Sequence, residues 1–380
     1  LGPEGRRFKS CRPDHFMINF FKPENKFNIN LQSPSKSFWT TFKKAFLIKK
    51  DFKSFWKKLN KDNLPKELVK ITNQFLKTES YEWVSKFWRH CMINHFKSIN
   101  RKTSEEALES IILTDVTSHT YFEKKNFNNT SKNLKNYDNV NINIFKKHKN
   151  LSSYDSISYN TTTLLYYNLK KEFTKSIYGK INRKFYSQYS PNVEIDNLEI
   201  NQHLMYTISE LEKLQKIIDL SKKDIRILEI GAGYGRTANA IISLYEGVKY
   251  VIADIPPTIF ASMTNLKKHY PNLKIDSAFN FSNSNDINDL IDENDVTFIF
   301  PHQLRQLGNK KFDLALMIGV SLEMEPRDIK RYMNFINIVS NNLYMKVFEF
   351  SGLPFSFYKV YRHNVKSDYF IHDNWEELFN

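Results

Sequence analysis

The 380-residue chain has only two cysteines, Cys11 and Cys91, which cannot form a disulfide framework or a cysteine-rich zinc site. It also lacks any uninterrupted apolar stretch of the roughly 18 residues that a membrane-spanning helix needs. The N-terminal residues have neither the apolar core nor the small-residue cleavage site of a signal peptide. Together these absences predict a soluble, cytoplasmic protein in a reducing compartment.

Negative charge is scarce in one half of the chain. The formal net charge is +15. Residues 1–200 carry 36 Lys and Arg against 19 Asp and Glu (+17), whereas residues 201–380 carry 20 against 22 (−2). A basic surface can attract nucleic acid, anionic lipid head groups or an acidic glycan. Asn, Lys, Ile and Phe are abundant throughout, so codon bias is an alternative source of much of the lysine.

The most informative segment, 228–236, reads Leu-Glu-Ile-Gly-Ala-Gly-Tyr-Gly-Arg in a chain with only 10 glycines. It lies between a β-branched run and an apolar stretch at 237–244, and a second apolar run at 250–253 ends in Asp254. Strand, glycine turn, helix, strand and acid form the unit that holds an adenosine-containing cofactor. In this unit the glycines permit a tight turn, and the acid accepts hydrogen bonds from ribose hydroxyls.

The spacing of the glycines indicates which cofactor is bound. A dinucleotide site needs G-x-G-x-x-G, but here the pattern is G-x-G-x-G and Arg236 stands at the third glycine position. We expect the Glu229 carboxylate to point into the ligand crevice, where it would repel a pyrophosphate and attract an ammonium. This favours S-adenosylmethionine, with S-adenosylhomocysteine as its product. The alternative is a glycine turn of some other α/β protein.

The C-terminal half alternates apolar strand patterns with helical patterns, which predicts a mostly parallel sheet with right-handed crossovers. The loop-forming run 282–286 separates two of these elements. The expected strands are 225–230, 249–254, 273–278, 296–300, 312–319 and 343–350. The expected helices are 236–245, 257–270 and 326–341.

The N-terminal half is helical in pattern over 37–123, 161–190 and 202–220, with a long loop or domain junction at 124–160. Its aromatic stripes indicate core packing, or alternatively a platform that stacks on carbohydrate or bases. We therefore predict an α/β fold of two domains. A mainly α-helical domain, 1–195, lids or shapes the acceptor pocket, and a Rossmann-like domain, 196–380, binds the cofactor.

Candidate catalytic residues follow the later strands, because ligands of such sheets lie beyond the carboxyl ends of the strands. Glu323 follows the strand 312–319 and can take a proton from an attacking hydroxyl, or it caps the next helix. His302 follows the strand 296–300 and approaches the adenine or the substrate, or it is a surface loop residue. His302 and Glu323 alone are too few for a metal site, so no divalent metal is indicated.

Two further absences narrow the chemistry. The Asp/Asn-Pro-Pro-aromatic turn of nucleic-acid amino-methylating enzymes does not follow the strand 312–319. Neither cysteine lies in the catalytic half or follows a proline, which excludes the cysteine nucleophile of cytosine C5 methylation. Nucleic acid is therefore the less favoured partner. Oxygen methylation needs only two positioned reactants and a modest base.

Over residues 200–380 the chain resembles the sugar O-methyltransferase family of S-adenosylmethionine-dependent, class I enzymes. The similar segments are 229–236, 253–256, 300–304, 321–324 (one residue shorter than in the family), 344–347 and Trp375. The resemblance implies methylation of a sugar hydroxyl in a bacterial surface polysaccharide or its precursor. The acceptor would be a sugar, nucleotide sugar or oligosaccharide. The expected cofactor-binding residues are Glu229, Gly231, Ala232, Gly233, Tyr234, Arg236, Asp254, Ile255, Pro301, Gln303, Ile318 and Gly319.

Two other functions fit the sequence. An RNA methyltransferase would use the basic half as a phosphate-binding surface. A non-catalytic scaffold would keep the fold without the chemistry.

Overall fold

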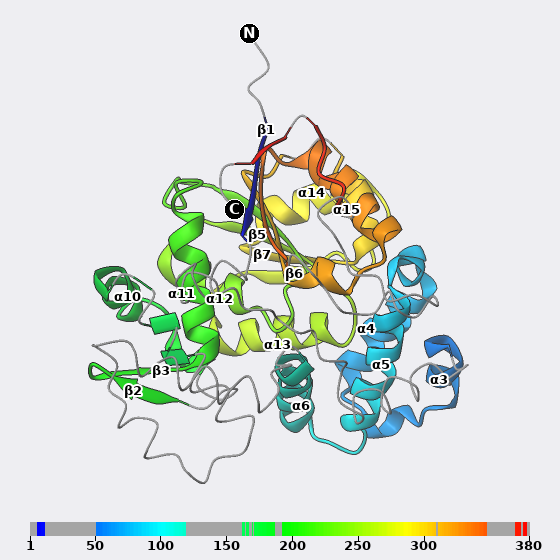
Figure 1. Cartoon of the computed structure of the whole chain (residues 1–380). Helices are drawn as coiled ribbons and strands as arrows, with labels where there is room; N and C mark the ends of the chain where they lie inside the picture. Colours follow the sequence, from blue (N-terminus) through cyan, green and yellow to red (C-terminus); the bar gives the residue numbers. More distant parts are fainter. Residues whose placement is uncertain are drawn as a thin grey trace, which may run out of the picture.

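A computed structural model describes residues 6–11, 51–118, 192–308, 311–347, 369–373 and 375–377, and most of 162–186. Figure 1 shows a large sheet with helices packed around it and a group of N-terminal helices at one side. The fold is Rossmann-like α/β, as the sequence predicts. Among the described residues, no helix combines the length and apolarity needed to cross a bilayer.

The main sheet has eight strands in the order β10-β1-β9-β8-β4-β5-β7-β6, and neighbouring strands are parallel throughout. After β4 the chain first pairs β5 on one side and later pairs β8 on the other. The carboxyl ends of β4 and β8 therefore form a topological switch point, where open α/β sheets bind ligands. The strands are β1 (Arg6–Cys11), β4 (Arg226–Ile230), β5 (Lys249–Ala253), β6 (Ile275–Ser277), β7 (Val296–Ile299), β8 (Leu314–Ile318), β9 (Asn342–Lys346) and β10 (Trp375–Glu377).

Both faces of the sheet are covered, which explains why its central strands are apolar without alternation. Ile227 packs on the face that carries α11 (Gln202–Leu214), α12 (Arg236–Leu244) and α13 (Thr258–His269). The next residue, Leu228, packs on the opposite face, with α14 (Ser284–Glu293) and α15 (Pro326–Val339).

The N-terminal helices share a hydrophobic core with the sheet. Phe75 meets Phe300, at the end of β7, edge to face with ring centroids 5.3 Å apart, and Phe300 stacks on Phe279 at 4.2 Å. The antiparallel pair β2 (Val193–Ile195) and β3 (Leu198–Ile200) spans the predicted domain boundary at residue 195. The helices are α3 (Phe52–Lys58), α4 (Lys66–Lys77), α5 (Lys86–Ser98), α6 (Ser104–Ser118) and α10 (Lys171–Tyr178), with the short 3-10 helix η2 (Glu79–Trp83) between α4 and α5.

The six expected strands and three expected helices of the C-terminal half are all present, with ends shifted by a few residues. The loop expected at 282–286 is wrong in part, because α14 begins at Ser284. Asn283 caps this helix by accepting a hydrogen bond from the backbone N–H of Asp286 at 2.8 Å. The strands β1 and β10, which extend the sheet beyond β9, are not among the expected strands. The long loop expected at 124–160 lies outside the described residues.

Candidate functional site

A cavity of about 280 Å³ lies at the carboxyl ends of β4, β5 and β8, where the topology predicts a ligand. Its walls come from the glycine turn, the ends of the strands, α11, α15 and the N-terminal segment 83–88. Ten of the twelve expected cofactor-binding residues line it: Gly231, Ala232, Gly233, Tyr234, Arg236, Asp254, Ile255, Pro301, Ile318 and Gly319.

The glycine turn is formed as the sequence requires. Gly231, Gly233 and Gly235 all have positive φ, at 73°, 59° and 87°, which only glycine adopts at low cost. Gly231 is required for a steric reason as well, since an added Cβ would lie 2.3 Å from a methyl carbon of Val320. The turn therefore leaves bare backbone facing the cavity, and α12 begins directly after it.

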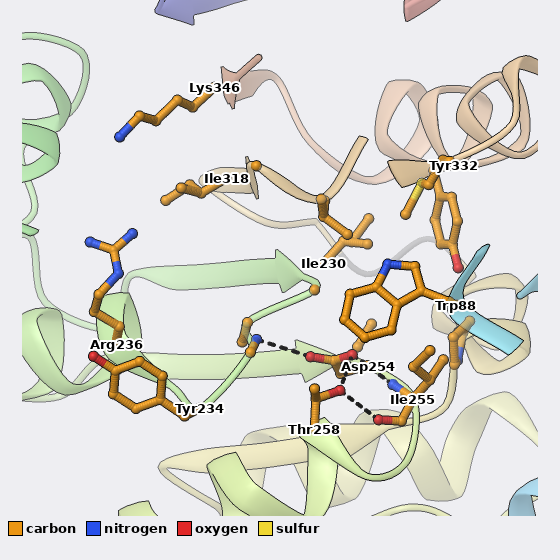
Figure 2. Close-up of a pocket in the computed structure, with 18 of the residues that line it drawn as sticks. Trp88, Ile230, Tyr234, Arg236, Asp254, Ile255, Thr258, Ile318, Tyr332 and Lys346 are labelled. Atoms are coloured by element: carbon orange, nitrogen blue, oxygen red, sulfur yellow. Dashed lines mark hydrogen bonds between the residues drawn. The ribbon is translucent and has the colours of Figure 1, made fainter. Parts of the chain in front are cut away.

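Asp254 ties the end of β5 to the glycine turn. One carboxylate oxygen accepts a hydrogen bond from the backbone N–H of Gly233 at 3.1 Å. The other accepts from the backbone N–H of Ile255 at 2.7 Å and from the hydroxyl of Thr258 at 2.9 Å (Figure 2). Each carboxylate oxygen can accept more than one hydrogen bond. These hydrogen bonds fix the buried acid in place. Because Asp254 also lines the cavity, its carboxylate can accept hydrogen bonds from a ligand.

A charged group of three residues lies at another part of the cavity wall. Arg236 and Lys346 both contact the buried Glu210, each with a shortest nitrogen–oxygen distance of 2.8 Å. Burial opposes ionisation of Glu210, but the charges of Arg236 and Lys346 outweigh it and lower the pKa of this carboxyl to about 2. The group thus carries two positive charges and one negative charge, and its net positive charge suits an anionic ligand group.

Glu229 does not point into the crevice as we expected. Its carboxylate is 2% exposed, does not line the cavity, and accepts a hydrogen bond from the hydroxyl of Tyr250 at 2.8 Å. Strand alternation accounts for this, because Ile230 and Glu229 point to opposite faces of the sheet. Burial, only partly offset by Tyr250 and Arg236, raises the pKa of Glu229 to about 7.

Gln303 and His302 also differ from expectation, since neither lines the cavity. The Gln303 carboxamide accepts from the backbone N–H of Phe300 at 2.8 Å and donates to the carbonyls of Ala278 and Phe281. His302 instead contacts Ser80, with its Nδ1 2.7 Å from the serine hydroxyl. Gln303 therefore holds a loop together, and His302 joins the N-terminal helices to the sheet domain.

Glu323 ends the short 3-10 helix η5 (Val320–Glu323), and its side chain lies outside the described residues. Its catalytic role stays a prediction. Among the described residues, no group of three or more His, Cys, Asp or Glu side chains is placed to hold a metal ion.

Several cavity residues were missed by sequence reasoning. On α11, Gln202, Tyr206 and Glu210 recur at four-residue spacing and line the cavity beside His203. A polar line along an otherwise apolar helix could have identified them.

The aromatic residues of the cavity gave no such signal, because their stripe is equally typical of a core. Trp83 and Trp88 belong to the N-terminal segment, and Tyr332 belongs to α15. Figure 2 shows Trp88 and Tyr332 at the end of the cavity opposite Arg236 and Lys346.

No protein-family model and no curated protein matches the chain. Solved structures match it at low similarity. The pyocyanin biosynthetic protein PhzM is 12% identical, with 37% of this chain and 36% of that chain covered and a TM-score of 0.25. The mitomycin 7-O-methyltransferase MmcR is 15% identical, with 38% and 39% covered and a TM-score of 0.25.

A Plasmodium falciparum protein described as a protein-L-isoaspartate O-methyltransferase, in complex with S-adenosyl-L-homocysteine, is 15% identical. The match covers 45% of this chain and 76% of the Plasmodium falciparum chain, with a TM-score of 0.27. The chain spans little more than a third of the length of PhzM and MmcR. At these identities and TM-scores, the function has to be argued from the cavity.

Proposed function

We propose that this chain is an S-adenosylmethionine-dependent methyltransferase. The observation that supports this most is the joint placement of Asp254 and the bare glycine turn on one cavity at the switch point of the sheet. When bound, S-adenosylmethionine supplies a methyl group on a sulfonium, which transfers to an acceptor oxygen and leaves S-adenosylhomocysteine. The chain's own residues bind this donor, orient it and accept the proton that the acceptor loses.

The donor set of the cavity fits this cofactor. Asp254 is a buried carboxylate acceptor suited to ribose hydroxyls. Arg236 and Lys346 supply the positive charge that the methionyl carboxylate requires, and Glu210 supplies a negative charge beside them that suits the ammonium. Gly231 and Gly233 line the cavity without side chains, so a ligand can approach the backbone of the turn closely.

Binding of S-adenosylhomocysteine tests the donor site directly. Isothermal titration calorimetry should detect binding to the wild type, and Asp254→Asn should weaken it by roughly 1–3 kcal/mol, the scale of a lost charged hydrogen-bond pair. Asp289→Asn is the matched control, since Asp289 is exposed on α14 away from the cavity. Equal affinities of the two variants would remove Asp254 from the site. Failure of the wild type to bind would refute the proposed function.

For the acceptor we propose a sugar hydroxyl. The resemblance of the segments 253–256 and 321–324 to sugar O-methyltransferases supports it. Gln202, Tyr206 and His203 give the wall of α11 amide, phenol and imidazole groups, which hydrogen-bond well to hydroxyls. His203 is a candidate proton acceptor, with its Nδ1 2.8 Å from the hydroxyl of Tyr234.

The basic first half of the chain favours a second candidate, RNA. Incubation with labelled S-adenosylmethionine and a panel of nucleotide sugars, oligosaccharides and short RNAs would separate the two. Label in a sugar, with binding insensitive to salt, supports the sugar acceptor. Label in RNA, with affinity that falls steeply as salt rises, replaces it. No label in any acceptor, with S-adenosylhomocysteine still bound, favours the scaffold.

A further inference from the structure

The cavity has two chemically different ends. Its charged end suits the methionyl group of the donor, whereas its aromatic end suits a different part of the ligand. Figure 2 shows Arg236, Tyr234 and Lys346 toward one end, Ile230 and Asp254 between, and Trp88 with Tyr332 toward the other. Sequence reasoning assigned the strand tail after β7 to the region that receives the adenine or the substrate. That tail supplies only Pro301 to the cavity, since His302 and Gln303 are engaged elsewhere.

Tyr332 presents a polar atom to the cavity from an otherwise buried ring. The residue is 3% exposed, and no described residue forms a hydrogen bond with its hydroxyl. Trp83 fixes the ring edge to face, with centroids 5.8 Å apart. Burial and the nearby carboxylates of Asp328 and Asp254 raise the pKa of Tyr332, so the hydroxyl keeps its proton. A hydroxyl that faces the cavity and has no hydrogen-bond partner among the described residues is available to bind a ligand.

Trp88 presents a half-buried indole to the same end of the cavity. It lies in the first turn of α5, which Ser85 caps by accepting a hydrogen bond from the backbone N–H of Trp88. His95 packs against the indole edge to face at 6.1 Å. Burial lowers the pKa of His95 to about 4, so the imidazole stays neutral near pH 7 and acts as a packing group. The indole is therefore positioned by the N-terminal helices.

We infer that Trp88 and Tyr332 form the base-recognition end of the donor site, Trp88 by stacking on the base and Tyr332 by a hydrogen bond to it. This inference rests on the proposed function. A ligand whose carboxylate meets Arg236 and Lys346 and whose ribose meets Asp254 must place its base beyond Asp254, where these two rings lie. It follows that the helical N-terminal segment completes the donor site.

Calorimetry with two ligands tests the inference on the full-length chain. S-adenosylhomocysteine carries the base, and S-ribosylhomocysteine has the same amino acid and ribose without it. We expect Trp88→Ala to weaken S-adenosylhomocysteine binding about 5- to 100-fold, the range for loss of a base-stacking ring. We expect Tyr332→Phe, which keeps the ring, to weaken it about 3- to 10-fold. Neither variant should change the affinity for S-ribosylhomocysteine.

Tyr245→Phe is the matched control, because this tyrosine lies beyond the end of α12 and outside the cavity. If Trp88→Ala is disturbed in folding, Trp88→Phe serves in its place. This variant keeps an aromatic ring and should retain most of the affinity. Unchanged S-adenosylhomocysteine binding in Trp88→Ala and Tyr332→Phe would overturn the inference while leaving the proposed function intact. An equal loss of affinity for S-adenosylhomocysteine and S-ribosylhomocysteine would also overturn it. The same holds if the variants lose affinity only for the methyl acceptor. A wild type that binds neither ligand would refute both proposals.

Discussion

At the residue scale, Glu229 shows what a motif can and cannot predict. The glycines and Asp254 could be placed from sequence, because backbone conformation and strand ends follow from residue type and order. The direction of Glu229 depends on the alternation of one strand and on a tyrosine in the neighbouring strand. Neither is part of the motif. The same holds for Tyr332, whose position depends on how α15 packs against Trp83.

The buried Glu229 carboxyl should make stability depend on pH. Its pKa is about 7 in the folded protein, above the usual value of 4.5, so the folded state binds more protons between these values. The free energy of unfolding should therefore be highest at low pH within this window and fall as pH rises toward 7. Relative to Glu229→Gln, we expect the wild type to lose about 2–3 kcal/mol between pH 5 and 8.

Urea titrations of both proteins across this pH range measure the difference, since other titrating groups cancel. The Gln side chain still accepts a hydrogen bond from Tyr250. A difference that stays constant with pH, or that grows in favour of the wild type, would show that Glu229 is not a buried neutral carboxyl.

At the scale of elements, the strands and helices of the C-terminal half were predictable because apolar period and turn residues mark them. The start of α14 was missed because Asn283 is typical of loops and of helix caps alike, and only its bond to Asp286 decides between them. The short helix after β7 (Pro301–Leu307) shows a similar ambiguity, because a polar residue there can bind either a ligand or backbone. The sequence led us to expect Gln303 at the ligand, but its side chain bonds to backbone.

Gln303 should therefore matter for stability. Gln303→Ala leaves the backbone N–H of Phe300 and the carbonyls of Ala278 and Phe281 without their amide partner in a buried place. We expect a loss of about 2–4 kcal/mol in the free energy of unfolding. Gln215→Ala, which removes only an exposed contact to Tyr245, is the control for the same substitution. A loss no larger than that of the control would mean that water replaces the amide.

At the scale of the whole molecule, the sheet and the described N-terminal helices pack into one hydrophobic core. The sequence indicated helices over 37–123, but their docking could not be derived from period alone. The docking depends on particular pairs between distant residues, such as Phe75 with Phe300 and Ser80 with His302. The role of this segment in the cavity depends on the same contacts.

A shared core predicts joint unfolding. Phe75→Ala removes a fully buried ring of α4 and should cost about 3–5 kcal/mol. Because the ring packs against Phe300, circular dichroism and tryptophan fluorescence should still report one coincident transition. Glu105→Ala, which breaks only an exposed ion pair with Lys268, should leave the midpoint unchanged. Two separated transitions in the Phe75 variant would mean that the helices fold independently of the sheet.

The stack of Phe300 on Phe279, covered by Phe75 of α4, has a practical consequence for expression of the sheet domain as a separate fragment. A fragment that begins after residue 195 would lack the Phe75 ring that packs on Phe300, so we expect it to expose more apolar surface and to aggregate more readily than the whole chain. Production of the whole chain keeps this aromatic contact covered.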